Sequence, residues 1–306
     1  MIGVYGANGF IGRNLLSRLV AGGVGVRAVS RRFDEDTVRS LSGSVEFTTA
    51  NFLDPLEMAA SLQDLSTVVQ LISTSSPGLK NEHAVADIKE NVIPHVEFLQ
   101  SCLQAGVRRY VFISSGGTVY GPDAMIPTPE SAPADPICSH GLTKLSIEKY
   151  IQMHGKVDGL EYVILRLSNP FGPGQEFRKG QGLIPAIMDR YRKGLPVRVF
   201  GGGLARRDYI FIDDVVDAIL AAIELAGPQQ AVINVGSGET RSVLEVIETI
   251  EEVCGISFER EWAESRKTDV DVSCLDISRA RKLLDWQPKT DFRDGIEKTL
   301  LGATAP

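Results

Sequence analysis

The chain has 306 residues, of which 43% are hydrophobic and 23% are charged, and its formal net charge is −7. This composition predicts an ordinary globular protein, and the negative charge without a basic tract argues against nucleic acid as the main partner. No apolar run approaches the ~20 residues that a membrane span needs, so we expect no membrane partner and a cytoplasmic location.

Short β-branched runs alternate with helical periodicity through the first half of the chain. The predicted strands are IGVY (2–5), GVRAVS (25–30), VEFTT (45–49), TVVQLIS (67–73), RYVFISS (109–115) and EYVILRLS (161–168). Strands that alternate with helices form a parallel sheet through right-handed crossovers. We therefore predict an α/β fold with a Rossmann-type, doubly wound parallel sheet over residues 1–168. Pro94 removes one hydrogen bond from a long helix before the fifth strand, which predicts a kink there.

The second half of the chain has a different pattern, because loops rich in glycine and proline follow Pro170. Helical stretches separate these loops, and no flexible linker is visible. We expect residues 169–306 to form a smaller α/β region that binds the substrate and closes over the carboxyl ends of the strands. The segment of about 206–235 is expected to return to the first domain.

The first chemical motif is GANGFIG, which places Gly6, Gly9 and Gly12 between the first strand and the first helix. Glycine permits a tight turn, close approach of the backbone to a pyrophosphate, and packing of the helix on the strand. The helix N-terminus, with Phe10 and Ile11, offers free N–H groups to the anion. The motif predicts a dinucleotide site, and a purely structural turn is the alternative.

The end of the second predicted strand indicates which dinucleotide binds. A carboxylate there binds both ribose hydroxyls of NAD, whereas arginine accommodates the 2′-phosphate of NADP. The chain has Ser30, Arg31 and Arg32 at this place. The sequence therefore favours NADP slightly over NAD, and a plain solvated charge is the alternative interpretation of the arginines.

The stretch ANFLDP follows the third predicted strand. In this fold class Asn51, Phe52 and Asp54 are expected near the adenine of the dinucleotide. A turn before the next helix explains the same residues equally well.

Seven motifs spread over nearly the whole chain share one order and spacing. They are GANGFIG (6–12), SSGGTVYG (114–121), HGLTKLSIEKY (140–150), RLSNPFGPGQ (166–175), RRDYIFIDDVVDA (206–218), NVGSGE (234–239) and DISRARKLLDWQP (276–288). Together they resemble the extended short-chain dehydrogenase/reductases, and within them the nucleotide-sugar epimerases and ketoreductases related to UDP-glucose 4-epimerase.

The resemblance implies that a Tyr-x-x-x-Lys pair and a nearby hydroxyl move a proton while a nicotinamide exchanges a hydride with the sugar. Lys144 matches the family lysine, which holds the nicotinamide ribose, and residues i and i+4 share one side of a helix. Thr118 is the best match for the hydroxyl partner. Asn91 matches the family asparagine that supports the lysine through water. The resemblance also assigns Leu71 and Ser73 to the cofactor site.

His140 stands where the family has its tyrosine, and three interpretations of it compete. In the first, histidine is the acid/base, since its reference pKa of about 6.5 suits neutral pH. Its nitrogen lies roughly 2 Å closer to the backbone than a tyrosine oxygen, which is a large misplacement, and Lys144 would keep the ring neutral. In the second, the acid/base is lost while binding is kept, and in the third, another residue works. We favour impaired or altered chemistry on an intact binding scaffold.

The resemblance also supplies residues for the nucleotide sugar, since the planar fork of arginine pairs well with phosphate oxygens. It places these residues near the diphosphate, around the base, and on the phosphate and ribose, respectively: Asn169 and Arg207; Leu183 and Phe200; Arg266 and Asp269. A solvated surface charge is the alternative interpretation of the two arginines.

The resemblance favours a 4-epimerase that oxidises C4 of a UDP-hexose, rotates the keto sugar and reduces it from the other face. Arg31 and Arg32 favour instead an NADPH-dependent 4-ketoreductase, which reduces a keto sugar once. A catalytically silent nucleotide-sugar or dinucleotide binder is the third possibility, and His140 is its only support. We place the epimerase first by a small margin.

Helices 84–105 and 139–155 correspond to the usual dimer surface of the family, so a homodimer is expected. The four cysteines, Cys102, Cys138, Cys254 and Cys274, lie far apart without a C-x-x-C pair. This spacing argues against a zinc site and against a disulfide framework, so no metal is expected.

Overall fold

The fold is described from a computed structural model that covers residues 1–75, 84–177, 182–227, 229–265 and 270–302. A seven-stranded sheet forms its centre, and every pairing in it is parallel. The strands, in spatial order, are β3 (Val45–Thr49), β2 (Val26–Ser30), β1 (Ile2–Tyr5), β4 (Thr67–Gln70), β5 (Arg109–Ser115), β6 (Glu161–Leu167) and β11 (Gln230–Val235). The fold class predicted from the sequence is confirmed. The strand order reverses between β1 and β4, which is where ligands bind in doubly wound sheets.

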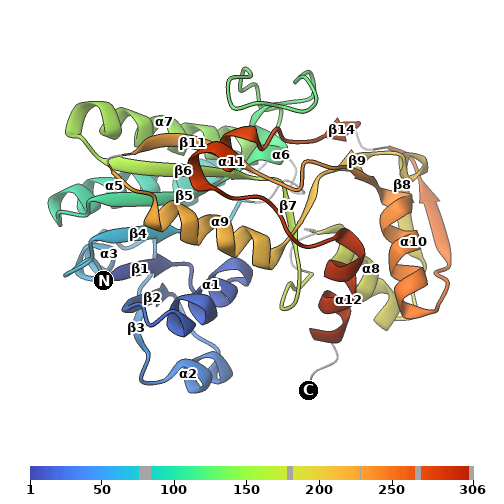
Figure 1. The fold of residues 1–306 in the computed structure, drawn as a ribbon, viewed down its shortest axis with the longest axis horizontal. Helices are drawn as coiled ribbons and strands as arrows, with labels where there is room; N and C mark the ends of the chain where they lie inside the picture. The colour runs from blue at the N-terminus through green and yellow to red at the C-terminus, as the bar shows by residue number, and fades with distance from the viewer. Residues whose placement is uncertain (76–83, 178–181, 228, 266–269, 303–306) are drawn as a thin grey trace.

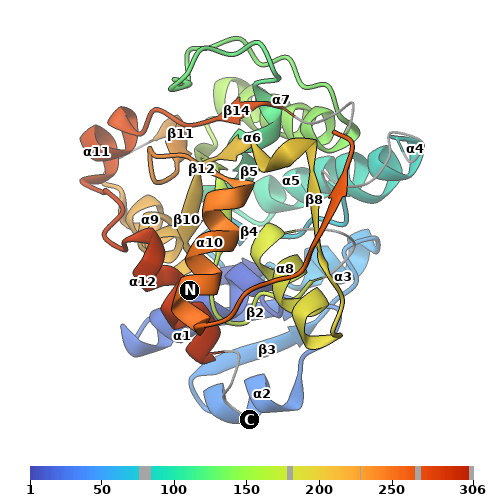
Figure 2. The ribbon, with the colours of Figure 1, turned by 90° about the vertical axis from the view of Figure 1, so that its right-hand side faces the viewer.

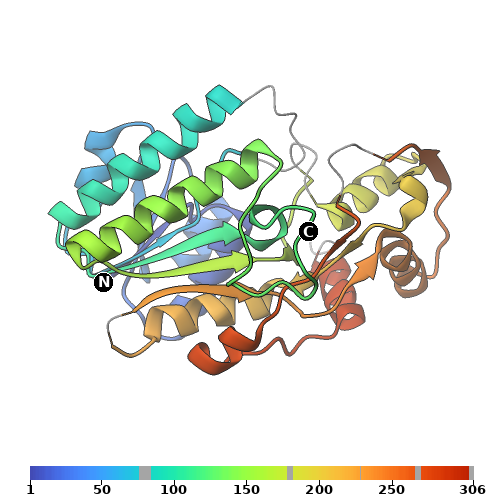
Figure 3. The ribbon, with the colours of Figure 1, turned by 90° about the horizontal axis from the view of Figure 1, so that it is seen from above.

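Helices cover both faces of this sheet, as Figure 3 shows. The α1 helix (Phe10–Ala21) and the α9 helix (Ile212–Glu224) pack together on one face, whereas the other face carries α3 (Pro55–Ala60), α5 (Ile93–Gln104) and α7 (Ser139–Asp158). The short α2 (Glu35–Leu41) follows β2. A sheet covered in this way needs strands that are apolar on both sides, and β6 is buried from Tyr162 to Leu167.

The long helix before β5 changes its winding near Pro94. It begins as α4 (Ala84–Asp87), continues as a π-helical turn, η2 (Ile88–Val92), and becomes α5. In the π turn the N–H of Ile93 donates to the carbonyl of Ile88. Pro94 has no N–H with which to bond the carbonyl of Glu90, so the local departure predicted from the proline takes the form of a π turn.

The smaller region lies beyond the carboxyl ends of the strands, on the right in Figure 1 and toward the viewer in Figure 2. Its strand pairs and short sheet are β7 (Asn169–Phe171) with β10 (Tyr209–Phe211), β8 (Val197–Phe200) with β13 (Arg260–Ala263), and β9 (Arg206–Arg207) between β12 (Arg241–Ser242) and β14 (Val272–Ser273). Its helices are α8 (Leu183–Arg192), η3 (Gly201–Gly203), α10 (Val243–Cys254) and α12 (Phe292–Gly302), and α11 (Ser278–Leu284) packs against α9 and β11.

The chain crosses between the two regions more than once. The β11 strand belongs to the main sheet, and the α9 helix packs on it, although both elements follow β7 and β8 in sequence. A domain boundary near residue 168, with a later return to the first domain, remains our proposal. Across the described ranges, no helix is long and apolar enough to cross a membrane.

Candidate active site

The turn between β1 and α1 has the geometry of an anion cradle. Gly6 has a φ of 84°, which glycine adopts without strain. A Cβ added to Gly12 would lie 2.5 Å from the carbonyl oxygen of Gly6 and 2.6 Å from that of Ala7, so α1 packs directly on the turn. Gly9 is the N-cap of α1 and supplies no side-chain cap. The first N–H groups of the helix, at Phe10 and beyond, are therefore free to bind a pyrophosphate.

The end of β2 presents two arginines to solvent. Ser30 is half-buried, whereas Arg31 and Arg32 are exposed. Neither arginine forms an ion pair with any residue of the described ranges. The neighbouring Asp34 is instead paired with Arg13 of α1 at 3.1 Å. Both guanidinium groups are therefore left without an acidic partner in the described part of the chain.

The residues of the turn after β3 contact other parts of the protein, as expected of a structural turn before a helix. The ring of Phe52 is buried and packs edge-on against His95 and Phe98, with centroid distances of 4.7 and 6.0 Å. Asp54 caps α3 by accepting from Leu56 and Glu57, and Asn51 Oδ1 accepts from the backbone of Leu53. The ring of Phe52 thus belongs to the core, and a contact of Asn51 or Phe52 with the adenine remains a prediction.

Buried polar residues follow one another along one face of α7. His140, Lys144 and Glu148 are spaced by four residues, and all three are buried. The Nζ of Lys144 donates to the carbonyl of Ile113 at the end of β5, at 2.9 Å, and lies 4.8 Å from the centre of the Phe112 ring. Burial lowers the pKa of Lys144 to about 8, with Glu148 opposing the shift. This cation is thus fixed beside the carboxyl edge of the sheet.

His140 is held by a residue that the sequence did not reveal. Its Nδ1 lies 3.0 Å from the hydroxyl oxygen of Ser75, which follows β4. Burial, and after it the charge of Lys144, lower the pKa of His140 to about 3, against an opposing hydrogen bond that the ring donates to the Ser75 backbone carbonyl. The ring is consequently neutral near pH 7, as the sequence interpretation anticipated. The nearby Thr118 has a buried hydroxyl with no hydrogen-bond partner among the described residues.

Asn91 lies in the π turn and clamps the segment after β4. Its Oδ1 accepts from the backbone N–H of Thr74, and its Nδ2 donates to the Thr74 hydroxyl, both at 2.9 Å. The backbone carbonyl of Asn91 lies 2.6 Å from Nδ1 of the fully buried His95. Leu71 and Ser73 precede the clamp in the same segment, half-buried and exposed respectively. The amide of Asn91 thus engages this segment directly, whereas its predicted support of Lys144 remains a prediction.

Glu148, one turn after Lys144 in α7, forms a buried ion pair with Arg166 of β6. Glu148 accepts from Arg166 Nη2 at 2.6 Å and from the Ser114 hydroxyl at 2.5 Å, and neither member of the pair reaches solvent appreciably. The Arg166 guanidinium also lies 4.8 Å from the centre of the Tyr120 ring. The sequence signal was available, because a charge in the middle of the apolar stretch EYVILRLS requires a buried partner.

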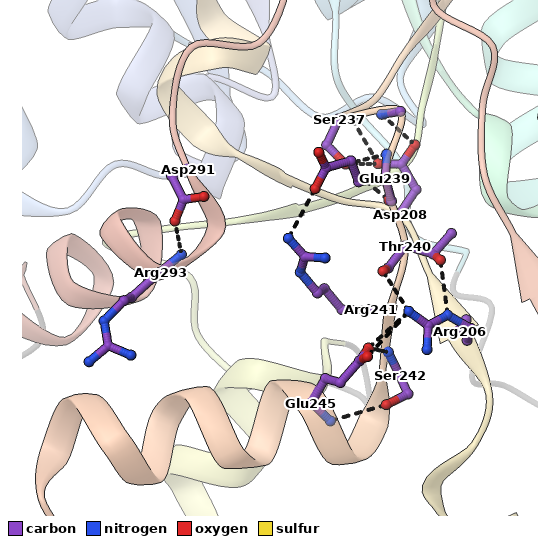
Figure 4. Close-up of polar contacts among 11 residues, drawn as sticks. Arg206, Asp208, Ser237, Glu239, Thr240, Arg241, Ser242, Glu245, Asp291 and Arg293 are labelled. Atoms are coloured by element: carbon purple, nitrogen blue, oxygen red, sulfur yellow. Dashed lines mark hydrogen bonds and ion pairs between the residues drawn. The ribbon is translucent and has the colours of Figure 1, made fainter.

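The two arginines of β9 differ in their partners. Figure 4 shows Arg206 turned toward Thr240 and Glu245, and its Nη2 lies 3.0 Å from a Glu245 oxygen. Arg207 donates only to the carbonyl of Arg206, at 2.9 Å, and has no carboxylate partner in the described ranges. Asn169, at the start of β7, donates its side-chain amide to the carbonyl of Asp208. Arg207, which the sequence places near the diphosphate, is therefore the arginine of β9 without a carboxylate partner in the described ranges.

Asp208 is a further residue that the sequence did not single out. It is fully buried, and its carboxylate accepts from the backbone N–H and the hydroxyl of Ser237 at 2.7 and 2.8 Å, as Figure 4 shows. These bonds tie the junction between β9 and β10 to the loop after β11. Arg207 directly precedes Asp208, and Asn169 donates to the Asp208 carbonyl, so Asp208 fixes the backbone beside both side chains.

Of the four other residues predicted to bind the substrate, two lie in the described part of the chain. Leu183 begins α8 after Gly182, and Phe200 ends β8; both side chains are half-buried. Arg266 and Asp269 lie outside the described residues. Within the described part of the chain, no cluster of three or more His, Cys, Asp or Glu side chains could hold a metal ion.

Comparison with known proteins places this geometry in context. A family model described as the NAD dependent epimerase/dehydratase family matches residues 2–236. The UDP-glucose 4-epimerase of Mycolicibacterium smegmatis is 33% identical over 303 residues, covering 97% of this chain and 96% of the relative. The dTDP-4-dehydro-6-deoxyglucose reductase of Escherichia coli is 30% identical over 303 residues, covering 97% and 95%. The structure of the Thermus thermophilus UDP-glucose 4-epimerase in complex with NAD matches with a TM-score of 0.90 and 28% identity, covering 100% of this chain and 99% of that one.

Proposed function

The chain belongs to the NAD-dependent epimerase/dehydratase family, and we propose that it is an NAD(P)-dependent nucleotide-sugar 4-epimerase acting on a UDP-hexose. The observation that carries the proposal is the buried pair of His140 and Lys144 on one face of α7, beside the carboxyl edge of the sheet. A 4-ketoreductase is the second candidate, because a reductase of Escherichia coli is 30% identical over nearly the whole chain.

The glycine turn fits the cofactor, since a Cβ at Gly12 would fill the space where α1 contacts the turn. When bound, NAD(P) supplies the hydride acceptor and donor for C4 of the sugar. Lys144 would hold the nicotinamide ribose, and His140 would take the proton from the sugar 4-hydroxyl and return it. The buried hydroxyl of Thr118, which has no partner in the described ranges, would hydrogen-bond the same sugar oxygen.

The neutral imidazole of His140 suits one direction of proton transfer better than the other. Its pKa of about 3 means that the protonated ring is a strong acid, which returns a proton readily to the sugar oxygen. The same low pKa makes the ring a weak base for removing that proton. We therefore expect slow turnover, limited by oxidation at C4, and this agrees with impaired chemistry on an intact binding scaffold.

On the substrate side, Arg207 carries the unpaired charge that a diphosphate requires. Asn169 lies beside it, and Leu183 and Phe200 are proposed to enclose the base. The assignment of Arg266 and Asp269 to the phosphate and ribose rests on the resemblance of the sequence. The cytoplasmic location also remains part of the proposal.

The proposal is tested by purifying the protein and identifying the nucleotide released on denaturation by mass spectrometry. The protein is then incubated with UDP-glucose or UDP-galactose, and the anomeric proton signals are followed by NMR. We expect slow interconversion without added cofactor. Reduction of a 4-keto sugar nucleotide by NADPH, without interconversion of the two hexoses, would establish the ketoreductase instead.

Arg31 and Arg32 are proposed to favour NADP over NAD, since both are exposed and unpaired within the described ranges. A charge-assisted hydrogen bond contributes about 1.5–3 kcal/mol, so Arg31→Ala or Arg32→Ala should weaken NADP binding by about 10-fold or more. NAD binding should change little. Arg39→Ala, in the neighbouring α2, is the matched control and should alter neither affinity. Equal losses for both dinucleotides in the Arg31 and Arg32 variants would contradict a 2′-phosphate contact.

The protein is also proposed to be a homodimer. Exposed apolar side chains cluster on neighbouring helices, namely Leu142, Tyr150, Met153 and Val157 on α7, and Val85, Ile88 and Ile93 on α4, η2 and α5. Figure 3 shows α5 and α7 side by side on the outer surface. Met153→Glu should give a monomer by size-exclusion chromatography with light scattering, because it buries a charge in the interface. Leu56→Glu, at an exposed apolar residue of α3, should leave the dimer intact. A monomeric parent protein would refute the interface.

A further inference from the structure

We propose that Ser75 is a positioning residue for His140, whose ring it orients so that Nε2 is the nitrogen presented to the reacting sugar oxygen. The inference rests on the proposed function, because that function assigns proton transfer to His140. No feature of the sequence indicates the pair, since 65 residues separate its members.

The geometry of the pair leaves one ring nitrogen for the substrate. Ser75 is 5% exposed and His140 is 7% exposed, so water competes weakly for either. The Ser75 hydroxyl lies 3.0 Å from Nδ1. An imidazole has two nitrogens with distinct partners, and the partner of one sets what the other can do. With Nδ1 engaged, Nε2 is the nitrogen free to meet a sugar oxygen.

The position of Ser75 is itself fixed by the helix on the same face of the sheet. Asn91 makes two hydrogen bonds to Thr74, one to its backbone and one to its hydroxyl. His95, one turn further along α5, is bonded to the carbonyl of Asn91. A continuous series of contacts therefore runs from the π turn through Thr74 and Ser75 to the ring of His140. Through this series Asn91 supports the histidine, in addition to any support of Lys144.

The Ser75 hydroxyl oxygen acts as an acceptor in this role. Nε2 can take the sugar proton only when the neutral ring carries its proton on Nδ1, and Nδ1 keeps that proton in the imidazolium. The Ser75 oxygen therefore accepts from Nδ1 in both halves of the reaction. A carboxylate would hold the protonated ring and oppose the return of the proton.

Kinetics of Ser75 variants test the positioning role. Ser75→Ala removes the hydroxyl contact that orients the ring, and we expect kcat for epimerisation to fall by about 10- to 100-fold, with KM and bound cofactor unchanged. Ser75→Thr keeps the hydroxyl and should recover most of the loss. Ser66→Ala is the matched control, since the Ser66 hydroxyl donates to the Met1 carbonyl just before β4, at the amino ends of the strands. An unchanged kcat in Ser75→Ala would overturn the proposal.

A spectroscopic test keeps the inference separate from the activity. The chain has 4 histidines, so ring ¹⁵N signals of the labelled protein are few, and His140 is assigned by the signal missing from His140→Asn. We expect Ser75→Ala to shift the ring nitrogen signals of His140, and Ser66→Ala to leave them unchanged. Signals of His140 that are the same with and without the Ser75 hydroxyl would overturn the proposal. If the parent protein shows no turnover, the proposed function fails while this measurement still decides the contact.

Discussion

His140→Asn is expected to lower epimerase turnover by about two to four orders of magnitude, which is the usual effect of losing a positioned acid/base. The asparagine amide can occupy the place of Nδ1 and keep the contact with Ser75, whereas nothing replaces Nε2. The cofactor should remain bound, because the glycine turn and Lys144 are untouched. Turnover is measured by NMR on UDP-glucose and UDP-galactose, and cofactor content by mass spectrometry of the denatured protein.

His140→Tyr separates the three interpretations of this histidine. A tyrosine oxygen reaches roughly 2 Å further than the imidazole nitrogen, and Ser75 occupies the space beside the ring, so we expect no gain in turnover. A silent parent protein that gains activity in His140→Tyr would instead show that the proton transfer had been lost. Unchanged turnover in His140→Asn would show that another residue moves the proton.

The parts of the site that the sequence predicts are those fixed by local geometry. Gly6 and Gly12 are required by a positive φ and by contacts with the adjoining turn, so a short motif suffices to find them. Lys144 was identified through the resemblance of HGLTKLSIEKY to a family motif, and its place depends on one helix and on the end of β5. Strands such as β5 and β6 are apolar throughout because both faces of the sheet are covered.

The parts that escaped prediction depend on contacts between distant segments. Ser75 meets His140 only because Asn91 fixes the segment after β4, and Glu148 meets Arg166 only because α7 packs on β6. The ring of Phe52 turns into the core, since α3 and α5 pack closely enough to enclose it. Long-range packing of this kind leaves no periodic signal in a single sequence.

Acid should unfold this protein more steeply than its carboxylates alone require, because two buried histidines stay neutral in the fold. Burial and the charge of Lys144 lower the pKa of both His95 and His140 to about 3. In the unfolded chain the reference pKa is about 6.5, so the unfolded state binds more protons once the pH falls below that value. The free energy of unfolding therefore decreases as the pH falls from about 6.5 to about 3. Each histidine is expected to remove about 2 kcal/mol by pH 5 and about 3 kcal/mol by pH 4, against a total stability of about 5–15 kcal/mol.

His95→Asn tests this expectation by urea unfolding at pH 7, 6, 5 and 4. The asparagine amide can still donate to the carbonyl of Asn91, as His95 does, but it does not titrate. The variant should be less stable at pH 7, since it leaves a cavity between Phe52 and Phe112, which flank the His95 ring at 4.7 and 5.7 Å. Its stability should nevertheless decline less with acid, by about 1.4 kcal/mol per pH unit below pH 6, and the double variant with His140→Asn should show about twice that difference. Because the carboxylates are the same in every variant, their contribution cancels in the comparison. Parallel stability curves for the parent and His95→Asn would mean that His95 is protonated in the fold, and that its bond to Asn91 holds a cation instead of a neutral ring.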